Sequence, residues 1–242
     1  ITEHVFENYE KPECYDHLAR VYKLLYKIKY QNLNLNVDDC KELFYSSISR
    51  ANAKKLLEGP KYINYNIFGT VTGRLATYPD SFPMLTLRKE MRKLVKPYND
   101  WFVSLDYNGA ELRTLLALSD QEQPEGDIHD WNMKNIFELS LTREEAKTSI
   151  FSWLYNPDSK SITTDIYNRD KLLEKWYNDG YVRTHFGREI EVEKRKAFNY
   201  LIQSTTSDIV LDRAVVIDKM LEGTKSFISH IVHDEIVLDM TD

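Results

Sequence analysis

The sequence predicts an α+β fold in which helices accompany strands that end in carboxylates. Apolar residues near the amino terminus recur at intervals of three and four, the spacing of a helix with one buried face: Leu18, Val21, Leu25 and Ile28. Further along, the short apolar run 101–105 ends in Asp106, and the run 228–232 is followed closely by Asp234. Such runs are typical of strands, and the first predicts a buried one.

The first 60 residues predict two helices. The segment after Pro12 predicts a helix that is broken over 32–36. A second helix is capped by residues 37–39 and runs towards Leu57, where Gly59-Pro60 stops it. We expect the two helices to form an antiparallel pair.

The remaining elements follow in order. Weak alternation over 62–68 predicts a strand, and 111–118 predicts a helix. The acidic stretch 119–138 is typical of a solvated surface. Thr142, with Glu145 three residues on, resembles a capping box that opens a helix to Tyr155. The later elements are a helix over 170–178, a hairpin over 180–188 with Gly187-Arg188 at its tip, a helical tract over 194–222 interrupted near 204–207, and a strand–turn–strand over 227–240.

The composition is that of a globular chain. Of the 242 residues, 42% are hydrophobic and 29% are charged, which is enough for a sizeable core. No apolar run approaches the roughly 20 residues of a membrane helix, and no signal-like segment opens the chain, so we expect no membrane partner and a cytoplasmic location. Two cysteines cannot build a disulfide scaffold and favour a reducing compartment. Because the chain begins at Ile1, we expect a fragment or a trimmed product.

Charge is distributed unevenly along the chain, so the net charge does not describe each segment. A formal charge of −6 disfavours a general nucleic-acid binder. Residues 61–113, however, hold eight cations against five carboxylates, whereas 114–142 hold one cation against six carboxylates. Within the basic part, Gly73 permits a close backbone approach, and Arg74 and Arg88 are suited to contact a nucleic-acid backbone or groove.

Asp106 and Asp234 predict a metal site. If their strands lie side by side in one sheet, both carboxylates meet at one edge. Magnesium prefers carboxylates, water and substrate phosphates, so two aspartates suffice to hold a pair of ions for in-line phosphoryl transfer. The alternative is that each aspartate simply caps a turn.

The predicted helix from Thr142 carries a stripe of two cations followed by two aromatic side chains. Its members stand four residues apart and so share one face: Arg143, Lys147, Phe151 and Tyr155. The cations suit phosphates, and the rings suit a sugar and bases. The alternative is an amphipathic helix with solvated cations and core aromatics.

A second stripe is suited to a duplex. Arg195, Asn199 and Gln203 also stand four residues apart. They offer donors to the N3 and O2 acceptors that every base pair presents in the minor groove. An exposed polar stripe explains the same spacing.

Together these motifs resemble the family A DNA polymerases, of the DNA polymerase I type. Residues 106–113 are similar to motif A, DYSxxELR; Arg143-x3-Lys147-x3-Phe151-x3-Tyr155 is similar to motif B; and His233-Asp234-Glu235 is similar to motif C. Three shorter matches are TGRL at 72–75, DIH at 127–129, and Arg195-x3-Asn199-x3-Gln203. The six motifs stand in the order of the family and cover about 62–238.

The resemblance implies a role for each matching residue. Asp106 and Asp234 would hold two Mg²⁺ ions with the backbone carbonyl of Tyr107, and Glu235 would lie near them as a further catalytic residue. The nucleotide-binding residues implied are His129, Arg143 and Lys147 for the triphosphate, Phe151 for the sugar and base, Tyr155 against the templating base, and Glu111, which would exclude a ribose 2′-hydroxyl. The DNA-binding residues implied are Arg74, Arg88, Arg195, Asn199, Gln203 and His233.

The resemblance also implies the right-hand polymerase architecture. This has an antiparallel palm sheet, small helical fingers and part of a helical thumb. The implied division is 1–60 for the partial thumb, 61–118 for the first part of the palm, 119–182 for the fingers and 183–242 for the second part of the palm. The chain departs from the family pattern at Asn156, where motif B usually continues with Gly, and at Gly109-Ala110, where motif A usually has Gln-Ile.

Template-directed DNA synthesis is the function that the resemblance implies, with primer–template DNA and deoxynucleoside triphosphates as partners. A single-subunit RNA polymerase relative is an alternative that Glu111 disfavours. A catalytically impaired DNA-binding fragment is another, although the metal aspartates and Lys147 are present. A two-metal nuclease would have no use for the motif B stripe. The short fingers suggest a viral or environmental replication enzyme, which would act in a host cell if viral.

Overall fold

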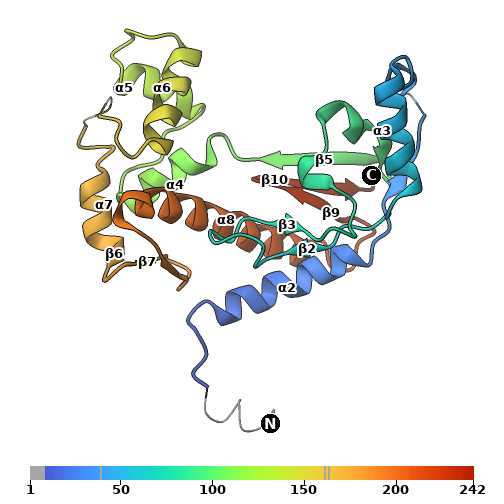
Figure 1. Cartoon of the computed structure of the whole chain (residues 1–242), viewed down its shortest axis with the longest axis horizontal. Coiled ribbons are helices and arrows are strands. Elements are labelled where there is room, and N and C mark those ends of the chain that lie inside the picture. Colours follow the sequence, from blue (N-terminus) through green and yellow to red (C-terminus); the bar gives the residue numbers. More distant parts are fainter. Residues whose placement is uncertain (1–8, 39, 161, 163) are drawn as a thin grey trace. The chain divides into compact units, whose positions relative to one another are not determined.

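A three-stranded antiparallel sheet joins the two runs that precede the aspartates. In this computed structural model, which describes residues 9–38, 40–160, 162 and 164–242, the strand order is β5 (Trp101–Asp106), β10 (Glu235–Met240) and β9 (Phe227–Val232). Glu235 pairs with Asp106 across one ladder and with Val232 across the other. The expectation that the two strands share a sheet is confirmed, but they do not lie side by side, because β10 separates β5 from β9 (Figure 1).

The prediction that 101–105 is a buried strand is wrong. Trp101, Val103 and Leu105 are 61%, 39% and 41% exposed. They alternate along β5, which lies at the edge of the sheet and pairs only with β10. An apolar run shows that a strand is favoured, but whether another layer covers that strand depends on distant parts of the chain.

The chain forms two compact units, each assembled from separate stretches of sequence. Unit 1 consists of residues 1–20 and 111–205, and unit 2 consists of residues 21–110 and 206–242. Each has a hydrophobic core of its own. None of the helices in the described part of the chain combines the length and the apolar character needed to cross a bilayer. The fourfold division into thumb, palm and fingers segments stays a prediction.

Unit 2 contains the sheet and several short elements. In chain order these are α2 (Tyr15–Lys29, of which residues 21–29 belong here), β1 (Asn34–Leu35), η1 (Lys41–Phe44), α3 (Ser47–Glu58), β2 (Tyr65–Asn66), β3 (Ala76–Thr77), η2 (Met84–Thr86), η3 (Lys89–Leu94) and β4 (Val95–Lys96). Antiparallel pairs join β1 to β4 and β2 to β3. The strand expected over 62–68 shortens to Tyr65–Asn66.

The second amino-terminal helix begins later than expected. A 3₁₀ turn occupies Lys41–Phe44, and α3 starts only at Ser47, where the Ser46 side chain accepts from the Ser49 N–H. The expected stop at Gly59 is confirmed. The expected antiparallel pair is not formed, because α3 packs on η1 and stands away from α2 (Figure 1).

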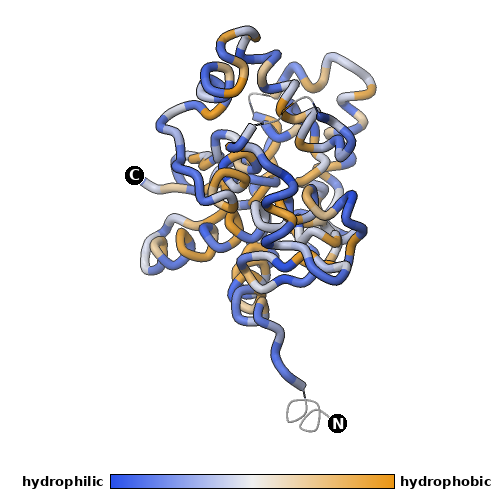
Figure 2. The backbone as a smooth tube through the Cα atoms, turned by 90° about the vertical axis from the view of Figure 1, so that its left-hand side faces the viewer, coloured by the Kyte–Doolittle hydropathy of each residue, from blue (hydrophilic) through white to orange (hydrophobic). Residues whose placement is uncertain are grey.

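Unit 1 is mainly helical. Its elements are α4 (Ala110–Leu118), α5 (Ile128–Asn135), α6 (Arg143–Tyr155), α7 (Arg169–Trp176), the strands β6 (Tyr177–Asn178), β7 (Tyr181–Arg183) and β8 (Glu189–Glu191), and the first part of α8 (Lys194–Met220). Hydrophobic and hydrophilic residues alternate in short runs along these helices, as expected where one face is buried (Figure 2). The expected hairpin is confirmed as β7–β8, with Gly187 at a φ of 72° in its loop.

Two expectations for unit 1 need correction. The acidic stretch is not simply a solvated surface, because Asp127 caps α5 and the side chains of Ile128, His129 and Asn132 are buried there. The helix after Lys194 is not interrupted near 204–207. Burial of this polar run within α8 outweighs the weak helix propensity of Ser and Thr.

The Tyr65 side chain forms hydrogen bonds to the backbone of β9, the strand at one edge of the sheet. Its buried hydroxyl donates to the Ile231 carbonyl at 2.6 Å and accepts from the Ile231 N–H at 2.9 Å. Both backbone groups of a β9 residue are thus satisfied by one side chain from β2. This contact ties the β2–β3 hairpin to the sheet that carries the aspartates.

Replacing Tyr65 with Phe should destabilise unit 2. The change keeps the ring but leaves the buried N–H and carbonyl of Ile231 without their partner, which costs about 1–3 kcal/mol. Urea unfolding followed by circular dichroism should show a lower midpoint with an unchanged slope. Tyr62→Phe is the matched control, because the Tyr62 hydroxyl makes only an exposed 3.4 Å contact to Asp80. Equal midpoints for the two variants would contradict the role of Tyr65.

Candidate functional site

The first part of the site is a group of carboxylates at one end of the sheet. Asp106 is the last residue of β5, Asp234 lies in the two-residue turn between β9 and β10, and Glu235 begins β10. The pKa of Asp106 is raised by partial burial and by the negative charges of Asp234 and Glu235, against a hydrogen bond from the Tyr107 backbone. A cation bound here would relieve that repulsion.

The three carboxylates are not equivalent. Glu235 accepts a hydrogen bond from the Ser104 hydroxyl at 2.6 Å and lies 3.5 Å from the Arg92 guanidinium. Asp106 and Asp234 are left as the oxygen donors for a cation. No three His, Cys, Asp or Glu side chains within the described ranges form a metal-binding group. Two carboxylates nevertheless fit magnesium, which fills its remaining positions with water and substrate phosphate.

A buried histidine lies in the middle of the same sheet. His230 lies on β9, contacts Ser229 through its Nδ1 atom at 3.0 Å, and meets Phe102 edge to face. Burial, together with the charge of Arg92, lowers its pKa to about 4. The imidazole is therefore neutral at neutral pH and adds no positive charge near Arg92.

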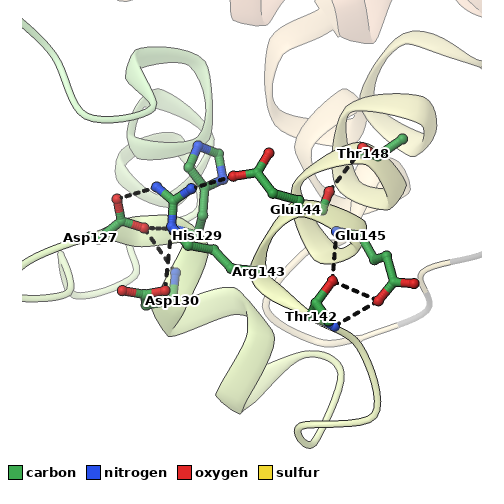
Figure 3. A network of polar contacts seen from close by, with 8 residues as sticks. All are labelled: Asp127, His129, Asp130, Thr142, Arg143, Glu144, Glu145 and Thr148. Atoms are coloured by element: carbon green, nitrogen blue, oxygen red, sulfur yellow. Dashed lines mark hydrogen bonds and ion pairs between the residues drawn. The ribbon is translucent and has the colours of Figure 1, made fainter.

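The stripe along α6, in unit 1, is a separate candidate group. Its amino terminus is held by the expected capping box, in which the Thr142 N–H and hydroxyl both donate to Glu145. Arg143 lies next to three carboxylates, at 2.7 Å from Asp127, 3.4 Å from Asp130 and 2.8 Å from Glu144 (Figure 3). These contacts raise its pKa, and any anionic ligand would have to exchange with them.

His129 lies beside this stripe with an unsatisfied ring nitrogen. Its side chain is buried, its Nδ1 atom has no hydrogen-bond partner among the described residues, and its ring is 5.9 Å from that of Phe151. Burial lowers the pKa of His129, and the nearby Lys147 and Arg143 lower it further, while Asp127 opposes the shift. Lys147 forms no ion pair with any residue that the structure describes.

The carboxyl-terminal half of the stripe meets motif A. The rings of Phe151 and Tyr155 are nearly parallel with centroids 6.2 Å apart. The Tyr155 hydroxyl donates a short hydrogen bond to the Glu111 carboxylate. Glu111 is itself buried. At the carboxyl-terminal end of α6 the structure therefore brings together three of the six residues predicted to bind the nucleotide.

The polar stripe on α8 contacts the end of α6. Asn199 donates to the Tyr155 carbonyl at 3.2 Å, and Arg195 pairs with Asp158 at 2.5 Å. Gln203 is half-buried on the same helix. These contacts fix how α6 ends, so the stripe has a structural role in addition to the predicted one.

Arg169 was missed by sequence reasoning. Its guanidinium lies 4.4 Å from the Trp153 ring centroid and 5.2 Å from that of Phe198. It also donates to the carbonyls of Asn156 and Pro157. No local pattern marks this residue, because its partners come from two separate stretches of the chain, 153–159 and Phe198.

The remaining predicted residues belong to unit 2. Gly73 has a φ of 74°, in the left-handed region that favours glycine, and its carbonyl accepts from the Ser207 hydroxyl at 2.9 Å. Arg74 follows in the same loop, and Arg88 is exposed before η3. His233 is exposed at the β9–β10 turn, where its φ of 57° is unusual for a residue with a side chain.

This chain is similar to DNA polymerase I. It is 25% identical to the DNA polymerase I of Chloroflexus aurantiacus and 27% identical to the thermostable DNA polymerase I of Thermus aquaticus, each over 75% of this chain. It is 26% identical to a DNA polymerase of Bacillus phage SP01 over 73% of this chain. The chain spans 25%, 28% and 26% of these proteins, about a quarter of their length. No protein-family model matches it.

A solved structure shares its fold. This is the POL domain of Pol1 from M. smegmatis, in a complex with DNA primer-template and dNTP. The match has a TM-score of 0.61 at 16% identity and covers 95% of this chain and 59% of that one. The polymerase resemblance that the motifs predict is confirmed by these similarities, and the fold is that of a polymerase domain.

The stability of unit 2 should depend on pH through His230. Its folded pKa of about 4 lies below the ordinary value of 6.5, so the unfolded chain binds more protons between these values. The contribution of neutral His230 to the free energy of unfolding should be fully present above pH 6.5. It should fall by roughly 2 kcal/mol on acidification to pH 5. Urea midpoints at pH 7 and pH 5 measure this difference. His230→Phe should shrink it, the exposed His185→Phe should not, and equal pH dependence in all three proteins would contradict the assignment.

Proposed function

We propose that this chain is the catalytic part of a template-directed DNA polymerase. It adds a deoxynucleotide to the 3′ end of a primer and releases pyrophosphate. The observation that carries the proposal is the meeting of Asp106 and Asp234 at one end of an antiparallel sheet. The similarity to DNA polymerase I over three quarters of the chain supports it.

Asp106 and Asp234 are the ligands for two magnesium ions, with the backbone carbonyl of Tyr107 as a further oxygen donor. When bound, the ions activate the primer hydroxyl and neutralise charge on the phosphates. Ser104 and Arg92 hold Glu235 beside them. Glu235 thus adds negative charge to the metal site without having to act as a ligand.

The triphosphate binds to the amino-terminal half of the α6 stripe. Lys147 supplies a positive charge that no described carboxylate neutralises, and the free Nδ1 of His129 supplies a hydrogen-bonding position. Arg143 exchanges its carboxylate partners for phosphate oxygens, which it binds in a fork geometry. Their positive charge stabilises the leaving pyrophosphate.

The sugar and base bind to the other half of the stripe. Phe151 packs on the incoming nucleotide, and Tyr155 closes the site against the templating base. The Tyr155 hydroxyl fixes the Glu111 carboxylate, which occupies the volume of a ribose 2′-hydroxyl. This contact favours a DNA polymerase over the RNA polymerase alternative.

Each unit carries its own set of proposed duplex-binding residues. Arg74, Arg88 and His233 come from unit 2, and Arg195, Asn199 and Gln203 come from unit 1. Their donors contact phosphates and the shared acceptors of the minor groove, so they bind primer–template DNA without reading its sequence. In this proposal the β5–β10–β9 sheet is the palm, the α5–α6 region is the fingers, and the amino-terminal helices are the remainder of a thumb.

Asp106→Asn and Asp234→Asn should each abolish primer extension. The substitution preserves shape but removes the charge that binds magnesium, so the rate should fall at least 100-fold, or about 2.7 kcal/mol. The measurement is extension of a labelled primer on a template with Mg²⁺ and deoxynucleotides. Asp100→Asn is the matched control, because Asp100 directly precedes the same strand and hydrogen-bonds to the chain end. Extension that survives both site variants would overturn the metal assignment.

Glu111→Ala should relax sugar selection. Removing the carboxylate opens space for a 2′-hydroxyl, so incorporation of ribonucleotides relative to deoxynucleotides should rise at least tenfold, or about 1.4 kcal/mol. Single-nucleotide incorporation kinetics measure the ratio. Glu111→Gln keeps the volume and should keep the selection. An unchanged ratio in Glu111→Ala would argue against Glu111 as the residue that excludes ribose.

A further inference from the structure

A row of exposed tyrosines runs along α2, and none of them has been assigned a role above. Tyr22, Tyr26 and Tyr30 are 57%, 50% and 67% exposed. They stand four residues apart, so each lies about 6 Å further along the helix than the one before. The opposite face of α2 is fully used by the core through Val21, Leu24, Leu25 and Ile28. The tyrosines are therefore not needed to bury α2.

The three rings form a continuous surface. The centroids of Tyr22 and Tyr26 are 6.1 Å apart, those of Tyr26 and Tyr30 are 4.7 Å apart, and the last two hydroxyls are hydrogen-bonded at 3.1 Å. Mutual contact restricts the rotamers of exposed side chains. The row therefore offers flat faces that are already ordered, which lowers the entropic cost of binding another flat group.

A pocket extends this surface onto the β2–β3 hairpin. Its volume is about 200 Å³ and its lining includes Tyr22, Tyr26, Lys29, Asn64, Phe68 and Tyr78. In Figure 1 the hairpin runs alongside α2, as the shared pocket requires. The volume is smaller than the roughly 300 Å³ at which pockets for whole ligands begin, so it suits one planar group of a longer ligand. The amide of Asn64 can bond the edge of such a group.

The charge of this region is opposite to that of the whole chain. Residues 21–37 and 59–79, which supply the tyrosine row and the pocket, contain five Lys or Arg and no Asp or Glu, in a chain of net charge −6. Lys27 is paired with Asp218 from α8, but Lys23 and Lys29 form no ion pair with a described residue. An array of aromatic faces flanked by cations matches the alternating bases and phosphates of a single strand.

We propose that the α2 tyrosine row and the adjoining pocket bind single-stranded nucleic acid. Bases stack on Tyr22, Tyr26 and Tyr30, one base enters the pocket beside Phe68 and Tyr78, and Lys23 and Lys29 contact the phosphates. The site binds without base specificity, because every base has a flat face. It goes beyond the proposed polymerase reaction and requires neither the metal ions nor an incoming nucleotide.

The test is binding of fluorescein-labelled dT₁₂ and U₁₂ to the whole chain in EDTA, measured by fluorescence anisotropy. Tyr26→Ala should weaken binding at least fivefold, and Tyr26→Phe, which keeps the ring, should restore it. Lys29→Gln should reduce the slope of log K against log salt by about 0.7. Tyr45→Ala is the matched control, since Tyr45 is 82% exposed outside the site. The two oligonucleotides distinguish DNA from RNA as the source of the strand.

Cross-linking separates this site from the proposed duplex-binding residues. Irradiation with 5-iodouracil in the strand should label peptides within 21–30 and 62–68, which contain none of the proposed duplex-binding residues. Labels confined to other peptides, or equal affinity for parent and Tyr26→Ala, would overturn the proposal, as would self-association of the chain that Tyr26→Ala abolishes. Because no metal or nucleotide is present, an inactive polymerase does not affect the result.

Discussion

The antiparallel register of β5 on β10 is the constraint on which the candidate site depends. It sets Asp106 opposite Glu235 and therefore next to the turn that carries Asp234. A slip of one residue would turn every side chain of β5 to the other face of the sheet. The Ser104–Glu235 hydrogen bond across the ladder opposes this slip, and the Tyr65 hydroxyl holds the outer edge of β9 on the other side of β10. Three stretches of chain thus cooperate to hold two carboxylates near one another.

The carboxylates on the sheet and the stripe on α6 differ in how far their charge is compensated. Repulsion from Asp234 and Glu235 disfavours the ionised form of Asp106, so binding a cation relieves an unfavourable interaction. The opposite holds on α6, where Arg143 is neutralised by Asp127, Asp130 and Glu144. A phosphate ligand has to displace these carboxylates from Arg143. Its affinity therefore depends on how much more favourable the Arg143–phosphate interaction is than the ion pairs that it replaces. In the proposed function, the carboxylates repel one another until a cation binds, whereas Arg143 already has carboxylate partners before the triphosphate binds.

The departure from the family pattern at Asn156 is accommodated by ordinary backbone geometry. Asn156 caps α6 with a φ of −96° and a ψ of 106°, so no left-handed residue and hence no glycine is required there. The backbone carbonyls at this end of the helix, which have no partner within the helix, accept hydrogen bonds from side chains instead. Asn199 binds the Tyr155 carbonyl, and Arg169 binds those of Asn156 and Pro157 while its guanidinium stacks on Trp153. A helix end that glycine would leave flexible is thereby fixed from two directions, which holds Tyr155 in place against Glu111.

Local patterns in the sequence determined much of this protein. The capping box at Thr142, the four-residue stripes on α6 and α8, the β7–β8 hairpin and the polymerase resemblance all depend on residues close together in the chain or on a fixed motif order. Tertiary structure alone decided that β5 is exposed, that 204–207 stays helical, that α2 and α3 do not pair, and that Arg169 closes the end of α6. Each of these depends on which surfaces meet. A short apolar or polar run has the same composition whether or not a distant segment covers it, and the free energy of burial is set only when that segment arrives.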